Sequence, residues 1–197
     1  SQKLEYWMGS AWMQIKTFSS TLDGGVRGVY AGGTEGPPGP ATNEIQFFTI
    51  STQGNAADFG DLTRERTPAS MGSNTRGVFA SGSPGGGPYY TNYMDFITIS
   101  QTGVCQDFGD NEPKVSGAFG ISNQTRGLIA GGTAPSITDR INYITIATTG
   151  DSKDFGDIGG VRRNCMGISN SIRGVFAGGL SPTVLNNIAY VTIATTG

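Results

Sequence analysis

The sequence predicts an all-β protein, a β-propeller of four blades, and three observations lead to that prediction. A seven-residue phrase that begins with Arg-Gly occurs four times. Four strand-sized segments recur with each copy of the phrase. Glycines recur at fixed positions and make up 32 of the 197 residues, about twice the usual share. A period of about 50 residues is typical of propellers, and four strands per period form one blade.

The first strand of each repeat is the phrase itself, which reads Arg27-Gly-Val-Tyr-Ala-Gly-Gly33 in its first copy. The four copies begin at Arg27, Arg76, Arg126 and Arg173, which lie 49, 50 and 47 residues apart. We expect a strand because β-branched and aromatic residues are followed by a glycine pair that ends the run.

The second strand of each repeat is a strongly apolar run that follows a variable loop. The four runs span residues 45–50, 94–99, 141–146 and 188–193. Side chains alternate along a strand, so Phe47 and its counterparts point to one face while Phe48 and Ile50 point to the other. A strand that is apolar on both faces must be covered on both faces, and neighbouring blades provide that cover.

The third and fourth segments complete the predicted blade. A Thr-Gly turn leads to Asp58-Phe-Gly-Asp61, which recurs at 107–110 and 154–157. The fourth segment carries an apolar residue five positions before each arginine: Leu22, Met71, Ile121 and Ile168.

Residues 1–18 stand apart from the propeller of residues 19–197. Two aromatic-rich pieces flank a Met-Gly-Ser turn between Glu5 and Ile15, which indicates a hairpin or an extended clasp. Gly197 is in register with Gly150, so the fourth repeat lacks its Asp-Phe-Gly-Asp strand. We expect residues 11–18, with Trp12, to supply that strand and to close the ring. The alternative is that the chain is a piece of a longer repeat array.

The composition excludes several classes of function. A net charge of −2 with 13 scattered Lys and Arg residues argues against nucleic-acid binding. No apolar run approaches the roughly 20 residues that span a membrane, and no signal-peptide pattern is present. The chain has no His, so a Ser-His-Asp triad, a Cys-His pair and a His metal site are excluded, and we expect no catalysis, metal or cofactor. Cys105 and Cys165 share no motif and are expected to be buried free thiols rather than a disulfide.

The glycine pair, the aromatic second strand, the aromatic outer strand and the basic residue before the next glycine pair together resemble the kelch repeat over nearly the whole chain. The period agrees with that family, although Phe stands where its outer strand usually has Trp and its His is missing. The wording of the repeats, together with Tyr6-Trp-Met-Gly-Ser-Ala-Trp12, looks most like kelch-like proteins of tailed bacteriophages. That resemblance implies a virion structural or host-contacting protein, located in the virus particle.

The recurring polar residues are expected to serve the blades. The aspartates at Asp58, Asp107 and Asp154 are expected to cap the turn, since two carboxylates per repeat fall short of a Ca²⁺ site. Each repeated arginine is expected to hold a backbone carbonyl or an Asp of its own or the neighbouring blade, and the alternative is an anion site in a central channel.

Binding residues are expected in the variable loops 34–43, 83–92, 133–140 and 180–187, which we place at one end of the propeller. The second loop is richest, and its candidate ligand-binding residues are Tyr89, Tyr90, Asn92, Tyr93 and Asp95. These residues suit a sugar or a peptide, or they pack against another subunit. We therefore expect a non-enzymatic virion protein whose partners are other virion proteins or itself. The alternatives are a module that binds a host-surface glycan or receptor and, third, a cytoplasmic kelch-type adaptor.

Overall fold

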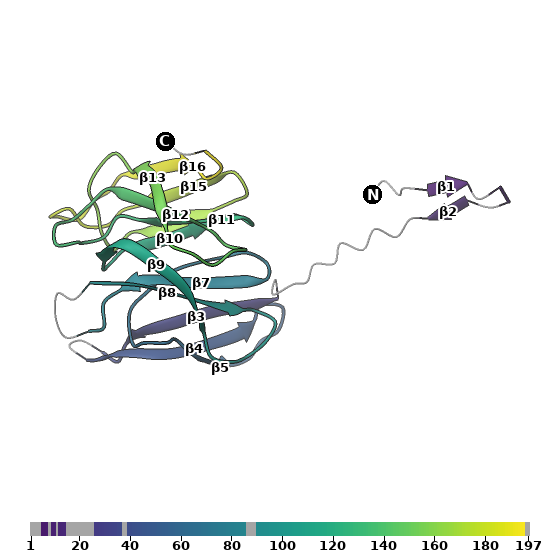
Figure 1. Cartoon of the computed structure of the whole chain (residues 1–197), viewed down its shortest axis with the longest axis horizontal. Helices are drawn as coiled ribbons and strands as arrows, with labels where there is room; N and C mark the ends of the chain where they lie inside the picture. The colour runs from purple at the N-terminus through teal and green to yellow at the C-terminus, as the bar shows by residue number, and fades with distance from the viewer. Residues whose placement is uncertain are drawn as a thin grey trace.

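The computed structural model describes residues 5–7, 9–10, 12–14, 26–36, 39–85 and 90–195. Over these residues the protein is all-β, as the sequence predicts, with 14 strands in four antiparallel sheets and a further two-stranded hairpin. Figure 1 shows the four sheets stacked in chain order, with the first and the fourth at opposite ends of the stack. No helix of the described residues is long and apolar enough to cross a membrane.

Each sheet is a meander in which strands that are neighbours in the sequence pair with each other. The first sheet contains β3 (Arg27–Thr34), β4 (Ala41–Thr49) and β5 (Ala57–Asp61). The second contains β6 (Ala69–Gly72), β7 (Arg76–Gly82), β8 (Thr91–Thr98) and β9 (Gln106–Val115). The third contains β10 (Phe119–Ser122), β11 (Arg126–Ala130), β12 (Arg140–Thr145) and β13 (Lys153–Asp157). The fourth contains β14 (Met166–Ser169), β15 (Arg173–Ala177) and β16 (Ile188–Thr192).

The N-terminal segment forms a hairpin of its own. Strand β1 (Glu5–Trp7) pairs antiparallel with β2 (Trp12–Gln14), with Tyr6 opposite Met13. Of the two arrangements that the sequence allows for this segment, residues 5–7 and 12–14 adopt the hairpin. Residues 11 and 15–18 of the expected clasp strand, and Leu22 of the expected fourth segment, lie outside the described residues. Strand β16 pairs with β15 alone in the described chain, and the four sheets are not closed into a ring by β2.

Strands β4, β8 and β12 each lie between two other strands of their sheet, and β16 occupies the same place in its repeat although it is an edge strand. These four strands, which we call the middle strands, are apolar on both faces, so each sheet has two apolar faces. We call the face toward the next sheet in the chain the trailing face, and the one toward the preceding sheet the leading face. In the second sheet, Phe96 and Met94 lie on the trailing face, and Phe79 and Ile97 on the leading face. Because both faces carry large apolar side chains, the free energy of burial favours stacking of one sheet on the next.

Three hydrophobic cores lie between the four sheets, one at each interface. Between the first and second sheets, Ile45 and Phe59 pack against Phe79 and Ile97. Between the second and third, Met71 and Phe96 pack against Ile129 and Ile144, and between the third and fourth, Ile121 and Phe155 pack against Phe176 and Ile193. The core of the protein is therefore a set of repeated interfaces and not a single centre.

The repeated arginines join each sheet to the next. Arg27 Nη1 donates to the carbonyl oxygen of Ile99 at 2.8 Å, Arg76 Nη1 to Ile146 at 2.9 Å and Arg126 Nη1 to Ile193 at 3.0 Å. Each guanidinium also lies 4.3 to 4.6 Å from the centre of the aromatic ring on its own middle strand: Phe47, Phe96 and Tyr143. This is the backbone-carbonyl role that the sequence analysis favours over an anion site.

The Thr-Gly turn and the Asp-Phe-Gly-Asp strand of neighbouring repeats meet at the first two interfaces. The backbone N–H of Gly103 donates to the Phe59 carbonyl oxygen at 2.7 Å, and that of Gly150 donates to Phe108 at 2.6 Å. The backbones approach so closely that a Cβ atom at Gly109 would lie 2.6 Å from the Gly150 carbonyl. A side chain at this position would separate the two sheets.

Cys105 and Cys165 are both free and buried, which confirms the expectation from the sequence. Burial, together with the negative charge of Asp95, raises the pKa of the Cys105 thiol to about 12. Burial also raises the pKa of the Cys165 thiol, and the neighbouring Arg162 opposes that rise. Both thiols are therefore protonated at neutral pH and poor nucleophiles.

The close approach between sheets predicts the effect of one substitution. A Cβ atom at Gly120 of β10 would overlap the Ser70 carbonyl oxygen of β6, whereas at Gly160 its nearest neighbour is a side-chain nitrogen at 3.9 Å. We expect Gly120→Ala to lower the free energy of unfolding by about 1–3 kcal/mol, because the sheets must move apart. Urea unfolding measures this change, with Gly160→Ala as the matched control. Equal stability of the two variants would contradict the close contact.

Candidate functional site

The variable loops of neighbouring sheets contact one another in the described chain. Pro40 of the first loop forms a β-bridge with Gly85 of the second, and the Tyr90 hydroxyl donates to the Pro135 carbonyl oxygen of the third at 3.5 Å. The third and fourth loops have the same local structure, with bridges between Thr133 and Ile137 and between Leu180 and Val184. The first three loops therefore lie side by side along one side of the stack.

A cleft of about 510 Å³ opens beside the base of the second loop. It is lined by Thr63, Arg64, Tyr93, Asp95, Asp107 and Asp110. A second hollow of about 380 Å³ shares Arg64 and Tyr93 with it and adds Glu65, Pro84 and Thr91. Arg64 and Tyr93 therefore stand between the two hollows, and the Arg64 guanidinium lies 4.4 Å from the centre of the Tyr93 ring. A flat cation on an aromatic ring offers both stacking and hydrogen-bond donation to a polar ligand.

Asp95 forms the buried floor of the cleft. Only 1% of its surface is exposed, and its Oδ2 atom accepts from Arg66 Nη2 at 2.8 Å and from the Thr63 backbone N–H at 3.0 Å. Its Oδ1 atom accepts from the Thr63 hydroxyl at 2.8 Å. The carboxylate is thus saturated by the protein, and it fixes the segment that carries Arg64 instead of serving as a free ligand contact.

The other residues predicted for the site are not gathered in this cleft. Tyr90 reaches the third loop, and the Asn92 side-chain amide donates to Glu112 Oε1 at 2.9 Å. Tyr89 lies outside the described residues. Of the five residues that the sequence singles out, Tyr93 and Asp95 therefore line one cleft, where Arg64 and Thr63 join them.

The repeated aspartates act locally. Asp107 Oδ1 accepts from the Gly109 backbone N–H at 3.3 Å, Asp154 lies 3.5 Å from Arg140 Nε, and Asp58 is exposed. Loss of solvent and the carboxylates of Asp151 and Asp107 raise the pKa of Asp110. In the described part of the chain, no group of three or more His, Cys, Asp or Glu residues is arranged to hold a metal ion.

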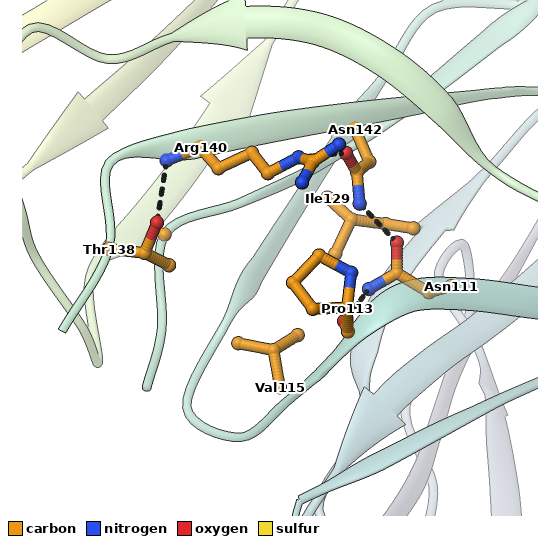
Figure 2. Close-up of a pocket in the computed structure, with 8 residues that line it drawn as sticks. Asn111, Pro113, Val115, Ile129, Thr138, Arg140 and Asn142 are labelled. Carbon is orange, nitrogen blue, oxygen red and sulfur yellow. Dashed lines mark hydrogen bonds between the residues drawn. The ribbon is translucent and has the colours of Figure 1, made fainter. Parts of the chain in front are cut away.

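A third hollow, at the interface of the second and third sheets, is filled by polar contacts (Figure 2). Asn142 Nδ2 donates to Asn111 Oδ1 at 2.8 Å, and Arg140 Nε donates to Asn142 Oδ1 at 3.1 Å. The space that remains is about 10 Å³, enough for a single water molecule. These residues therefore hold two sheets together and do not form a ligand site.

Asp95 and Asn142 occupy the same position in their repeats, the second residue of the apolar run, and Ala189 occupies it in the fourth sheet. Arg162 occupies the position in the third repeat that Arg66 occupies in the first. The Arg66 backbone N–H donates to the Thr42 carbonyl oxygen, and the Arg162 backbone N–H donates to that of Thr138. Each threonine lies three residues before the apolar run of its repeat. Only 3% of Arg162 is exposed, and its Nη1 atom has no hydrogen-bond partner among the described residues. The fourth sheet thus lacks the carboxylate that the second sheet presents to Arg66.

The chain matches no protein-family model, and a search of the curated proteins found no match. The candidate site is therefore defined by its own geometry. Sequence reasoning missed Arg64 and Arg66, although Arg64-Glu65-Arg66 is a dense run of charge in a chain with only 14% charged residues. That departure from the composition is the signal that marks the segment.

The position shared by Asp95 and Ala189 predicts opposite effects on stability. Asp95→Ala leaves the Arg66 charge buried without its partner, and we expect the free energy of unfolding to fall by about 3–5 kcal/mol. Ala189→Asp supplies a carboxylate to Arg162, and we expect a rise of about 1 kcal/mol. Urea unfolding measures both changes, with the uncharged Ala189→Asn as the control. The equivalence of the two arginines would be refuted if Ala189→Asp were less stable than Ala189→Asn.

Proposed function

We propose that the four sheets are kelch-like propeller blades and that the chain is a non-enzymatic structural protein of a bacteriophage virion. Its role is to decorate or extend a capsid or tail, with other virion proteins as partners. The observation that carries the proposal is the division between repeated and variable residues. The repeated Arg, Thr-Gly and Asp-Phe-Gly-Asp positions make contacts between sheets, whereas the first three variable loops meet along one side of the stack.

The state of the reactive groups supports a role without catalysis. Cys105 and Cys165 are buried with raised pKa values, and Asp95 is paired with Arg66 and Thr63. Features that recur in every repeat serve the repeat itself, as they do in other repeat proteins. The virion assignment is supported by the resemblance of the repeat wording to kelch-like phage proteins.

Immunogold electron microscopy tests this proposal. Antibody raised against the purified chain is applied to intact particles that are pelleted from lysed host cultures. We expect gold at a fixed place on the particle, because a structural component is present in constant copy number. Protein that stays entirely in the soluble fraction, with unlabelled particles, would rule out the virion role.

The cleft at Arg64 and Tyr93 favours a second candidate function, recognition of a glycan on the host surface. A half-buried tyrosine beside an exposed arginine and the carboxylates of Asp107 and Asp110 suits a polar, ring-shaped ligand. In this function the variable loops are the contact surface of the particle.

A glycan array tests the second candidate. We expect saturable binding whose affinity falls by about 5- to 30-fold in Tyr93→Ala, since loss of one stacking contact costs roughly 1–2 kcal/mol. Val104→Ala is the control, because Val104 is 71% exposed between β8 and β9 and does not line the cleft. Binding that is equally weakened in both variants, or absent from the intact chain, would exclude recognition through this cleft.

A further inference from the structure

The trailing face of the fourth sheet is exposed among the described residues, whereas the trailing faces of the other three sheets are buried. Ile188 is 72% exposed, although the residues at its position in the other three sheets, Ile45, Met94 and Ile141, are 0% exposed. Ile168 is 71% exposed, against 6% for Met71 and 3% for Ile121. An exposed patch of this kind marks a surface that binds another protein.

The leading face of the first sheet is likewise exposed among the described residues, whereas the leading faces of the other three sheets are buried. Tyr30 is 47% exposed, whereas its counterpart in the fourth sheet, Phe176, is 0% exposed. Ile50 is 62% exposed, whereas Ile146 and Ile193 are 1% and 0% exposed. In Figure 1 the two faces lie at opposite ends of the stack, so they do not cover each other within one chain.

The polar contacts of the interface are also divided between the two ends. At each internal interface an arginine donates to the carbonyl oxygen of the isoleucine that follows the next middle strand. Arg173 is stacked 4.4 Å from the centre of the Tyr190 ring like the other three arginines. Within the described chain its guanidinium donates to no carbonyl oxygen. Ile50 is the residue of the first sheet that corresponds to Ile99, Ile146 and Ile193.

We propose that the trailing face of the fourth sheet binds the leading face of the first sheet of a second copy of this chain. In this contact Arg173 donates to the Ile50 carbonyl oxygen of the second copy, and Ile168 and Ile188 are buried against its Tyr30 and Phe48. The contact continues the interface that already occurs three times inside the chain. Because two different faces meet, association is head to tail and yields a ring or a filament. This inference does not depend on the proposed virion function.

Light scattering coupled to size-exclusion chromatography tests this proposal on the whole chain over roughly a hundredfold range of concentration, because association follows mass action. We expect the intact chain to form species of two or more copies. Ile168→Arg and Ile50→Arg each block one face with an unpaired charge. Either substitution should raise the dissociation constant by roughly 100-fold and leave a monomer at concentrations where the intact chain associates.

A mixture of the two variants distinguishes head-to-tail contact from any other. Each variant keeps the face that the other has lost, so an equimolar mixture should form a dimer of one copy of each and nothing larger. Val104→Arg is the matched control, because Val104 is an apolar residue, 71% exposed, between β8 and β9 and outside both faces. This control should associate like the intact chain.

Three results would overturn the proposal: a monomeric intact chain throughout the concentration range, association that survives both substitutions, or a mixture of the variants that stays monomeric. A chain without residues 1–18 tests the main alternative, in which the N-terminal segment covers one of the two exposed faces. If only that truncated chain associates, the N-terminal segment covers one of the faces and the second copy does not. Far-ultraviolet circular dichroism of each variant verifies that the sheets remain folded.

Discussion

The structure depends on one constraint, that a middle strand with large apolar side chains on both faces must be covered twice. A sheet of this chain standing alone would be unstable, because it would expose both of its apolar faces to water. Phe79 and Phe96 of the second sheet illustrate the point, since they are buried in different cores on its two sides. Stability therefore increases with each neighbouring pair of sheets, as in other repeat proteins.

The recurring motifs are explained by this stacking. A guanidinium reaches from each sheet to the next and ends on a backbone carbonyl oxygen, an acceptor that is present whatever side chain occupies the position. Glycine recurs where backbones of two sheets touch, as at Gly109 and Gly150. The residues that recur in the repeats are those that make contacts between neighbouring sheets, and the residues that differ lie outside these contacts.

The all-β fold and the strands could be predicted from the sequence, since apolar alternation, Gly pairs and the repeat period fix their places. The hydrogen bond from a repeated arginine to a backbone carbonyl oxygen was also among the predicted alternatives, because the arginine recurs in every repeat. The cleft could not be predicted in full. Arg64 and Thr63 lie about 30 residues before Tyr93 and Asp95, and only the stacking of two sheets brings them together. Asp95 has a side chain suited to contact a polar ligand, but its burial beside Arg66 depends on the tertiary structure. The pairing of β2 with β1 also differs from the expected pairing of residues 11–18 with the fourth repeat.

The polar pairs at the interfaces have a consequence for folding. Near-identical repeats are prone to misassembly, because any sheet could dock on any other. The pair of Arg66 with Asp95 and the pair of Asn111 with Asn142 differ from one interface to the next. If the third sheet docked on the first, Asn142 would replace Asp95 beside Arg66, and the guanidinium would lose its carboxylate partner. If the fourth sheet docked there, Ala189 would replace Asp95, and Arg66 would have no polar side chain at that position. Burial of an uncompensated charge disfavours both arrangements. At the first interface these side chains thus favour docking of the second sheet over docking of the third or the fourth.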